Sequence, residues 1–125
     1  MSTIKQEIKQ CMLKIDNTAG NKIKAHFLFP EHFIGFKGHF PGNPVLPGIC
    51  QVQALITIAE KLHKKKAGLR RVVLAKFFKQ ISQDEAVLFD YTEENKQNNE
   101  FNIKALVNTV NGEKIAKLEL EINFL

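Results

Sequence analysis

The chain has 125 residues, of which 44% are hydrophobic and 25% charged, and its net charge is +5 with a pI near 9.3. These values are those of an ordinary globular protein with a single domain over residues 1–125, and they exclude a disordered or fibrous chain. No apolar run approaches the roughly 18 residues that span a bilayer, and residues 1–6 lack the apolar core of a signal peptide. We therefore expect a cytoplasmic protein that does not enter membranes.

The first third of the chain predicts a β-hairpin. A strand is expected from about Gln6 to Ile15, the turn-forming residues 16–21 follow, and a second strand is expected over residues 22–29. After Pro30, a short turn over residues 31–33 leads into a loop.

The loop over residues 38–48 reads GHFPGNPVLPG and holds three prolines and three glycines. Such a loop loses little entropy when it orders, because proline fixes φ and glycine adopts conformations that other residues avoid. Its titratable group is His39, whose ordinary pKa of about 6.5 lets it take a proton near neutrality. A helix is expected from Gly48, where free N–H groups and the helix dipole would stabilise a carbonyl oxygen that gains negative charge.

The helix is expected to run from Gly48 to about Lys66 and to be surrounded by a sheet. One face carries Ile49, Val52, Ile56, Ala59 and Leu62, and the stripe is widened by Ala54, Leu55 and Ile58. Four strands are predicted behind it, over residues 71–81, 86–92, 101–110 and 114–124, with a polar hairpin tip at 93–100 and a tight Asn111-Gly112 turn. This order predicts an α+β fold, an antiparallel sheet wrapped around one long central helix.

The segment His39-Phe40-Pro41-Gly42, followed by Pro44 to Ile49, resembles the signature of the 3-hydroxyacyl-acyl-carrier-protein dehydratases, a hotdog-fold family. The resemblance implies a cofactor-free dehydratase of fatty-acid or polyketide-type synthesis, a dimer whose sites mix residues of two subunits. It implies His39 as the base and the Gly48 N–H as the group that polarises the thioester carbonyl. Phe40, Pro47, Phe77 and Phe78 would line the substrate site, although core packing is an equal interpretation for Phe77 and Phe78.

One position departs from the family pattern. The family has an acid fourteen residues after the loop histidine, and this chain has Gln53 there, an amide that cannot protonate a leaving group. Glu60 is too far along the helix to replace it, by about 10 Å. Three alternatives therefore stay open: a dehydratase in which Gln53 holds water or the hydroxyl, a weakly active partner subunit or carrier-binding protein, and a thioesterase. A homodimer, or a heterodimer with an acid-bearing homologue, is compatible with the first two.

Basic residues gather near the end of the helix. We predict that Lys64, Lys65, Lys66, Arg70 and Arg71 dock an acidic acyl carrier protein, with a merely solvated surface as the plain alternative. Nucleic acid is not expected as a partner, because no stacking platform accompanies the charge.

The remaining cysteines and histidines are assigned structural roles. Cys11 and Cys50 are expected to be buried packing residues, with a thioesterase nucleophile as the minor alternative for Cys50. His26, His32 and His63 have no visible partner in the sequence, and no metal site is expected.

Overall fold

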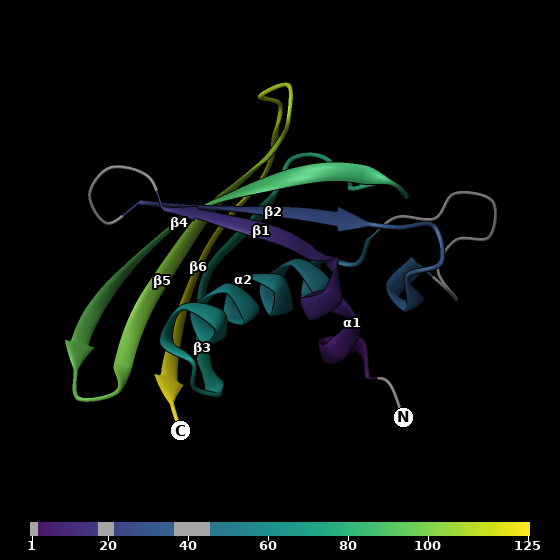
Figure 1. Cartoon of the computed structure of the whole chain (residues 1–125). Helices are drawn as coiled ribbons and strands as arrows, with labels where there is room; N and C mark the ends of the chain where they lie inside the picture. The colour runs from purple at the N-terminus through teal and green to yellow at the C-terminus, as the bar shows by residue number, and fades with distance from the viewer. Residues whose placement is uncertain (1–2, 18–21, 37–45) are drawn as a thin grey trace.

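The computed structural model describes residues 3–17, 22–36 and 46–125, and these form an α+β fold. Its elements are α1 (Ile4–Cys11), β1 (Met12–Asn17), β2 (Ile23–Phe29), a 3₁₀ turn (Ile34–Phe36), α2 (Gly48–His63), β3 (Ala67–Phe77), β4 (Glu85–Gln97), β5 (Glu100–Thr109) and β6 (Lys114–Phe124). All strand pairs are antiparallel, in the order β1-β2-β4-β5-β6-β3. The sheet curves over α2, and α1 lies beside that helix (Figure 1).

Helix α1 occupies residues for which a strand was predicted, so that prediction is right only from Met12 onward. The helix starts in a capping box: the Gln6 N–H donates to Thr3 Oγ1 at 3.2 Å, and the Thr3 N–H donates to Gln6 Oε1 at 3.0 Å. Ile8 and Cys11 face the core from this helix. The described residues thus contain two α-helices rather than the single one expected.

Helix α2 ends earlier than predicted and buries a different face. Lys64 takes a left-handed conformation, φ 55°, and stops the helix before Lys66. Ile49 was placed on the buried face but is 67% exposed, whereas Ala54, Leu55 and Ile58 are fully buried. The face toward the sheet is therefore centred on these last three residues.

The strand predictions hold in type but shift at their ends. The β1–β2 hairpin is confirmed, with Asn17 opposite Ile23, and Gly112 takes φ 90° in the predicted β5–β6 turn. Strand β3 starts at Ala67, four residues earlier than expected. Strand β4 runs to Gln97, so most of the stretch predicted as a hairpin tip is paired strand.

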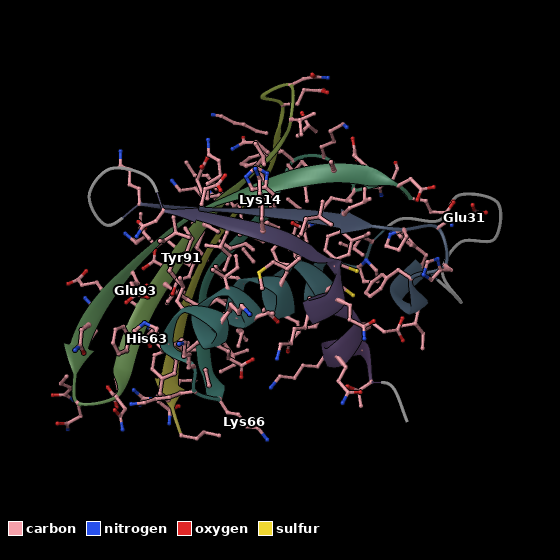
Figure 2. All side chains as sticks on the ribbon, in the orientation of Figure 1. Lys14, Glu31, His63, Lys66, Tyr91 and Glu93 are labelled. Atoms are coloured by element: carbon pink, nitrogen blue, oxygen red, sulfur yellow. The ribbon has the colours of Figure 1, made fainter. Side chains whose placement is uncertain are left out.

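Two histidines have partners that were not expected. His63 Nε2, at the end of α2, lies 2.9 Å from Glu93 of β4, and the Tyr91 hydroxyl donates to the same carboxylate at 2.8 Å (Figure 2). The β1–β2 register brings His26 Nε2 to 2.9 Å from Asp16 Oδ2. The prediction that these histidines stand alone is therefore wrong for both. The pair of His63 and Glu93 fastens the end of α2 to the sheet.

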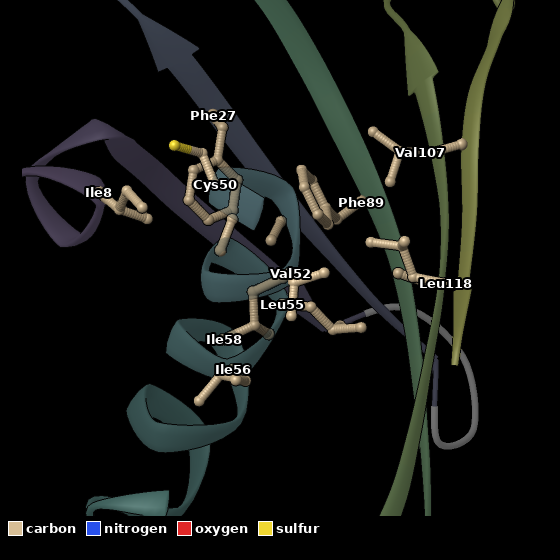
Figure 3. Packing of buried hydrophobic residues seen from close by; sticks show 14 of the residues in the cluster. Ile8, Phe27, Cys50, Val52, Leu55, Ile56, Ile58, Phe89, Val107 and Leu118 are labelled. Atoms are coloured by element: carbon tan, nitrogen blue, oxygen red, sulfur yellow. The ribbon is translucent and has the colours of Figure 1, made fainter. Parts of the chain in front are cut away.

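The core lies between α2 and the sheet. Leu55 and Ile58 of α2 face the sheet residues Phe27, Phe89 and Leu118, all of them buried (Figure 3). Cys11 and Cys50 are buried as predicted. In the described residues, no helix is long and apolar enough to cross a bilayer.

Phe77 and Phe78 do not belong to this core. Their side chains are 49% and 58% exposed, so core packing is wrong for both. Both residues lie where the edge strand β3 ends, and this leaves them available for another role.

Candidate active site at the start of helix α2

At the start of α2, the backbone N–H groups of Gly48 and Ile49 have no hydrogen-bond partner among the described residues. Pro47 is the N-cap, with φ −61° and ψ 144°, and its side chain supplies no capping hydrogen bond. The chain entering the helix is held by the Leu46 N–H, which donates to Ile81 O at 3.0 Å. Because the first N–H groups of a helix have no carbonyl one turn earlier, those of Gly48 and Ile49 can receive an oxygen that gains negative charge.

Gly48 lies against the ring of Phe77. A Cβ atom at Gly48 would come within 2.8 Å of Phe77 Cζ, closer than carbon atoms approach one another. The backbone after the ring is fixed, because the Phe78 N–H donates to Ile115 O at 2.7 Å. The structure thus brings Pro47, Gly48 and Phe77 together, with Phe78 next in the chain. His39 and Phe40 lie outside the described residues.

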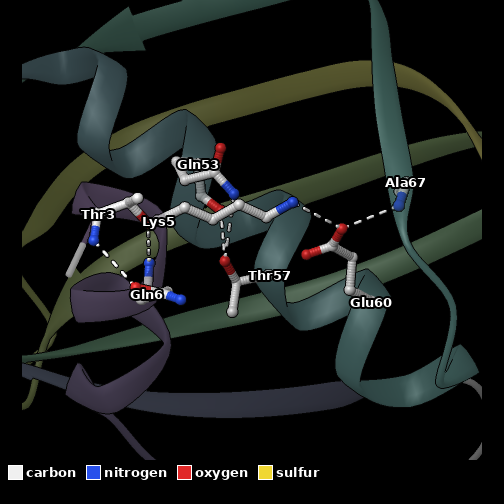
Figure 4. A network of polar contacts seen from close by, with 7 residues as sticks. All are labelled: Thr3, Lys5, Gln6, Gln53, Thr57, Glu60 and Ala67. Carbon is white, nitrogen blue, oxygen red and sulfur yellow. Dashed lines mark hydrogen bonds and ion pairs between the residues drawn. The ribbon is translucent and has the colours of Figure 1, made fainter. Parts of the chain in front are cut away.

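Gln53 lies one and a half turns further along α2 and is partly exposed. Its Nε2 donates to Thr57 Oγ1 at 3.4 Å, and the Thr57 hydroxyl donates to Gln53 O at 2.8 Å (Figure 4). This amide therefore has a weak side-chain partner and remains able to bond a further group.

Glu60 serves a structural purpose. Its Oε2 accepts from Lys5 Nζ at 3.2 Å and from the Ala67 N–H at 2.9 Å, which ties α1 and the start of β3 to α2 (Figure 4). Three carboxylates on or near β4 also have partners: Asp84 accepts from the Glu31 N–H, Glu85 pairs with Lys79, and Asp90 pairs with Lys24.

Gln51 is a buried polar residue that was not predicted from the sequence. Its side chain is only 2% exposed, and its Oε1 has no hydrogen-bond partner among the residues described. Two residues along a helix correspond to about 200° of rotation, so Gln51 and Gln53 project to nearly opposite sides of α2. A polar residue inside the apolar stretch 49–59 was the available signal. A buried acceptor without a partner costs stability.

Cys50 has the properties of a packing residue. Burial raises the pKa of its thiol to about 11, and burial also raises the pKa of Cys11 to about 11. Since the thiolate is the reactive form, little nucleophile is present at neutral pH. This argues against the thioesterase mechanism in which Cys50 attacks the acyl group.

The basic residues of the predicted docking surface fall into two groups. Arg70 pairs with Glu100 at 2.8 Å, and Arg71 donates to both carboxylate oxygens of Glu121, at 2.9 and 3.3 Å. The bond between Arg71 and Glu121 raises the pKa of the arginine and lowers that of the glutamate. Lys64, Lys65 and Lys66 are exposed, form no ion pair within the described part of the chain, and lie about 24 Å from Gly48 along α2.

Comparisons with known proteins agree with this arrangement. The sequence model of the ApeI-like family, described as ApeI dehydratase, matches residues 15–116. The 3-hydroxyacyl-[acyl-carrier-protein] dehydratase FabZ of Ligilactobacillus salivarius is 35% identical over 92 residues, which are 68% of this chain and 65% of that protein. The FabZ of Clostridium acetobutylicum is 32% identical over 97 residues, 72% of this chain and 67% of that one. The match thus spans about two thirds of these relatives' length.

Solved structures show the hotdog fold. The dehydratase heterocomplex ApeI:P from Xenorhabdus doucetiae has a TM-score of 0.72 at 15% identity, covering 90% of this chain and 96% of that one. A hypothetical thioesterase from Streptococcus pneumoniae, solved with coenzyme A, has a TM-score of 0.68 at 6% identity, covering 90% of this chain and 84% of that one. At these identities the likeness concerns the fold alone.

Proposed function

The chain belongs to the ApeI-like dehydratase family, and we propose from this premise that it takes part in removing water from 3-hydroxyacyl thioesters of acyl carrier protein. The FabZ relatives support the reaction class and the kind of substrate. The observation that carries the proposal is the start of α2, where the Phe77 ring packs on Gly48 and the first N–H groups of the helix have no partner among the described residues.

His39 is the proposed base. It removes the proton on the α-carbon of the acyl group, and the electron pair of that bond moves toward the thioester carbonyl. The carbonyl oxygen gains negative charge beside the Gly48 N–H, where a helix start stabilises it. When the electrons return, the bond between the α- and β-carbons becomes double and the β-hydroxyl leaves. That hydroxyl takes up a proton and departs as water.

The described site has no evident donor for that last proton, because Gln53 stands where the family has an acid. The amide of Gln53 can bond the hydroxyl or a water molecule but has no acidic proton to give. We therefore propose that a second chain supplies the acid in the fully active assembly.

Strand β3 is the proposed dimer edge. It pairs only with β6 in the described sheet and exposes the apolar side chains of Leu69, Val72, Val73 and Phe77 along its length, with exposed Phe78 next in the chain. An unpaired apolar edge is costly in a monomer and is covered when a second strand adds to it. A second copy of this chain would cover the edge but would bring Gln53 again, so the chain that supplies the acid is a homologue that carries it. The second candidate function is that of a partner subunit, which contributes His39 to a mixed dimer and has little activity alone. The presence of Gln53 in place of an acid favours this function.

The experiment compares three preparations. We would purify the chain alone, with Gln53→Glu, and coexpressed with an acid-bearing homologue, and measure enoyl formation from 3-hydroxybutyryl-acyl carrier protein beside release of free thiol. We expect little turnover alone and a gain from either the Gln53→Glu variant or the mixed complex, seen as one species in size exclusion. Thiol release without enoyl formation would identify a thioesterase instead. No gain from either source would show that the acid at this position is not what limits the chain.

A further inference from the structure

A groove between α1 and the end of α2 is strongly basic. Its volume is about 720 Å³. Among the described residues, its charged lining consists of Glu60 and six lysines, Lys5, Lys9, Lys61, Lys64, Lys65 and Lys66. Glu60 is bound to Lys5, and the other five lysines form no ion pair within the described residues. All six lysines are exposed, so five positive charges face solvent without compensation.

The groove differs from the neighbouring basic strand. Arg70 and Arg71 lie close in sequence to the groove, but each is paired with a glutamate of β5 or β6. A paired guanidinium must give up its carboxylate before it binds another anion, and an unpaired lysine has no such cost. Lys9 also joins the groove from α1, far away in sequence from the helix end. The surface suited to an acidic partner is therefore the six-lysine groove, without the two arginines.

The position of the groove relates it to the site of a second chain. Within one chain, the groove begins at Thr57, about 14 Å from Gly48 along α2, and its lysines at the helix end lie about 24 Å from Gly48. A two-fold antiparallel pairing of β3 about its middle residue, Val72, would instead place the start of β3 opposite the partner's Phe77. Paired strands lie about 4.8 Å apart, so Lys66, which precedes β3, would lie beside the partner's Phe77 and Gly48.

We propose that this six-lysine groove docks the acidic acyl carrier protein and that it serves the Gly48 site of the partner subunit. The proposal rests on the function proposed above and adds the docking surface and its direction. Electrostatic attraction at such a rim acts mainly on the rate of encounter, which salt reduces.

The first test is binding. Lys9→Glu, Lys65→Glu and Lys66→Glu are combined in a groove variant. The control combines Lys104→Glu, Lys114→Glu and Lys117→Glu, which make the same change of charge on β5 and β6. Binding of labelled acyl carrier protein is followed by fluorescence anisotropy at several salt concentrations. We expect the groove variant to bind at least about tenfold more weakly, the low end of electrostatic steering, and the control much less so. Equal loss in both variants would overturn the groove as the docking surface, as would tighter binding of a duplex DNA probe than of the carrier.

The second test is complementation between subunits. The readout is deuterium uptake from D2O at the α-carbon of a butyryl group on the carrier, which needs the base and not the acid. We mix the groove variant with a His39→Ala chain in one dimer. If the groove of one chain serves the site of the other, the intact groove of the His39→Ala chain serves the intact site of the groove variant. Exchange should then proceed at about half the wild-type rate, because one of the two sites in the dimer is functional. Exchange no faster than in the two parent dimers would show that docking acts within one chain and would overturn the direction.

The two proposals fail differently. If the wild-type chain exchanges no deuterium into the carrier substrate or into the butyryl thioester of N-acetylcysteamine, the proposed chemistry is wrong. The anisotropy result still decides the groove in that case. If exchange occurs and the groove variant keeps the wild-type preference for carrier over the small thioester, the groove fails and the chemistry stands.

Discussion

Gly48→Ala tests the space beside the start of α2. The new Cβ would lie 2.8 Å from Phe77 Cζ and 3.1 and 3.3 Å from two further ring atoms. To restore a carbon contact of about 3.5 Å, the ring must retreat by about 0.7 Å. It is half exposed and can do so, and alanine favours a helix over glycine by up to about 1 kcal/mol. We expect Tm to change by less than about 4 °C.

The effect on activity should be much larger than on stability. The methyl group and the displaced ring would crowd the proposed position of the carbonyl oxygen beside the Gly48 N–H. We expect kcat/KM for enoyl formation to fall about 100-fold, the lower end of what one such donor contributes. The assay uses 3-hydroxybutyryl-acyl carrier protein and whichever assembly of the chain is active.

A matched control is available on β3. At Gly68 an added Cβ would meet no atom closer than 3.7 Å, so Gly68→Ala makes the same chemical change without crowding. It should leave kcat/KM unchanged. Combining Gly48→Ala with Phe77→Ala should recover part of the loss if the ring causes it. Wild-type kcat/KM in Gly48→Ala would refute the placement of the carbonyl at this helix start.

Three further predictions concern buried polar groups. Gln51→Leu removes a buried acceptor that lacks a partner among the described residues, so the free energy of unfolding in urea should rise by about 1 kcal/mol. A loss of stability would mean that Oε1 is already bonded. Tyr91→Phe should lower the free energy of unfolding by about 2 kcal/mol, because the hydroxyl bonds a charged carboxylate. Burial, and to a lesser extent Glu93, raises the pKa of Tyr91. The stability that the Tyr91 hydroxyl contributes is therefore complete below its ordinary pKa of about 10 and is lost as pH rises above that value. Between pH 9 and about 11 the wild type should lose more stability than Tyr91→Phe, and equal losses in the two proteins would contradict this. Cys11 and Cys50 should react with a thiol reagent at pH 8 only after unfolding, since both are buried; rapid labelling of the folded chain would reopen a chemical role for Cys50.

Local sequence signals predicted much of this fold. The strands of the second half alternate apolar and polar residues, and their types are all confirmed. Helix α1 was missed although Thr3 and Gln6 form a capping box and Ile4, Ile8 and Cys11 recur at helical spacing. The short segment joins directly to β1, and the two together resemble one long strand in the sequence. The error came from starting the predicted strand at Gln6, six residues before the observed strand begins at Met12.

The site was less accessible to sequence reasoning. The Pro-Gly start of α2 was found, because fixed backbone residues are visible in a sequence. The exposure of Ile49 was not predicted, because most sides of this helix are apolar and the sequence does not show which of them is buried. Ion pairs were also hidden: Arg71 and Glu121 are fifty residues apart, and only the register of β3 against β6 joins them. For the same reason the lysines of α1 could not be assigned to the groove.

The central claim is that His39 acts as a base on an acyl group bound at the start of α2. Deuterium uptake at the α-carbon of butyryl-acyl carrier protein in D2O, compared between the wild type and His39→Gln, measures that step without need of an acid. We predict uptake well above the uncatalysed rate in the wild type and its loss in His39→Gln, with both chains equally folded. Undiminished uptake in His39→Gln, or none in the wild type, would contradict the claim.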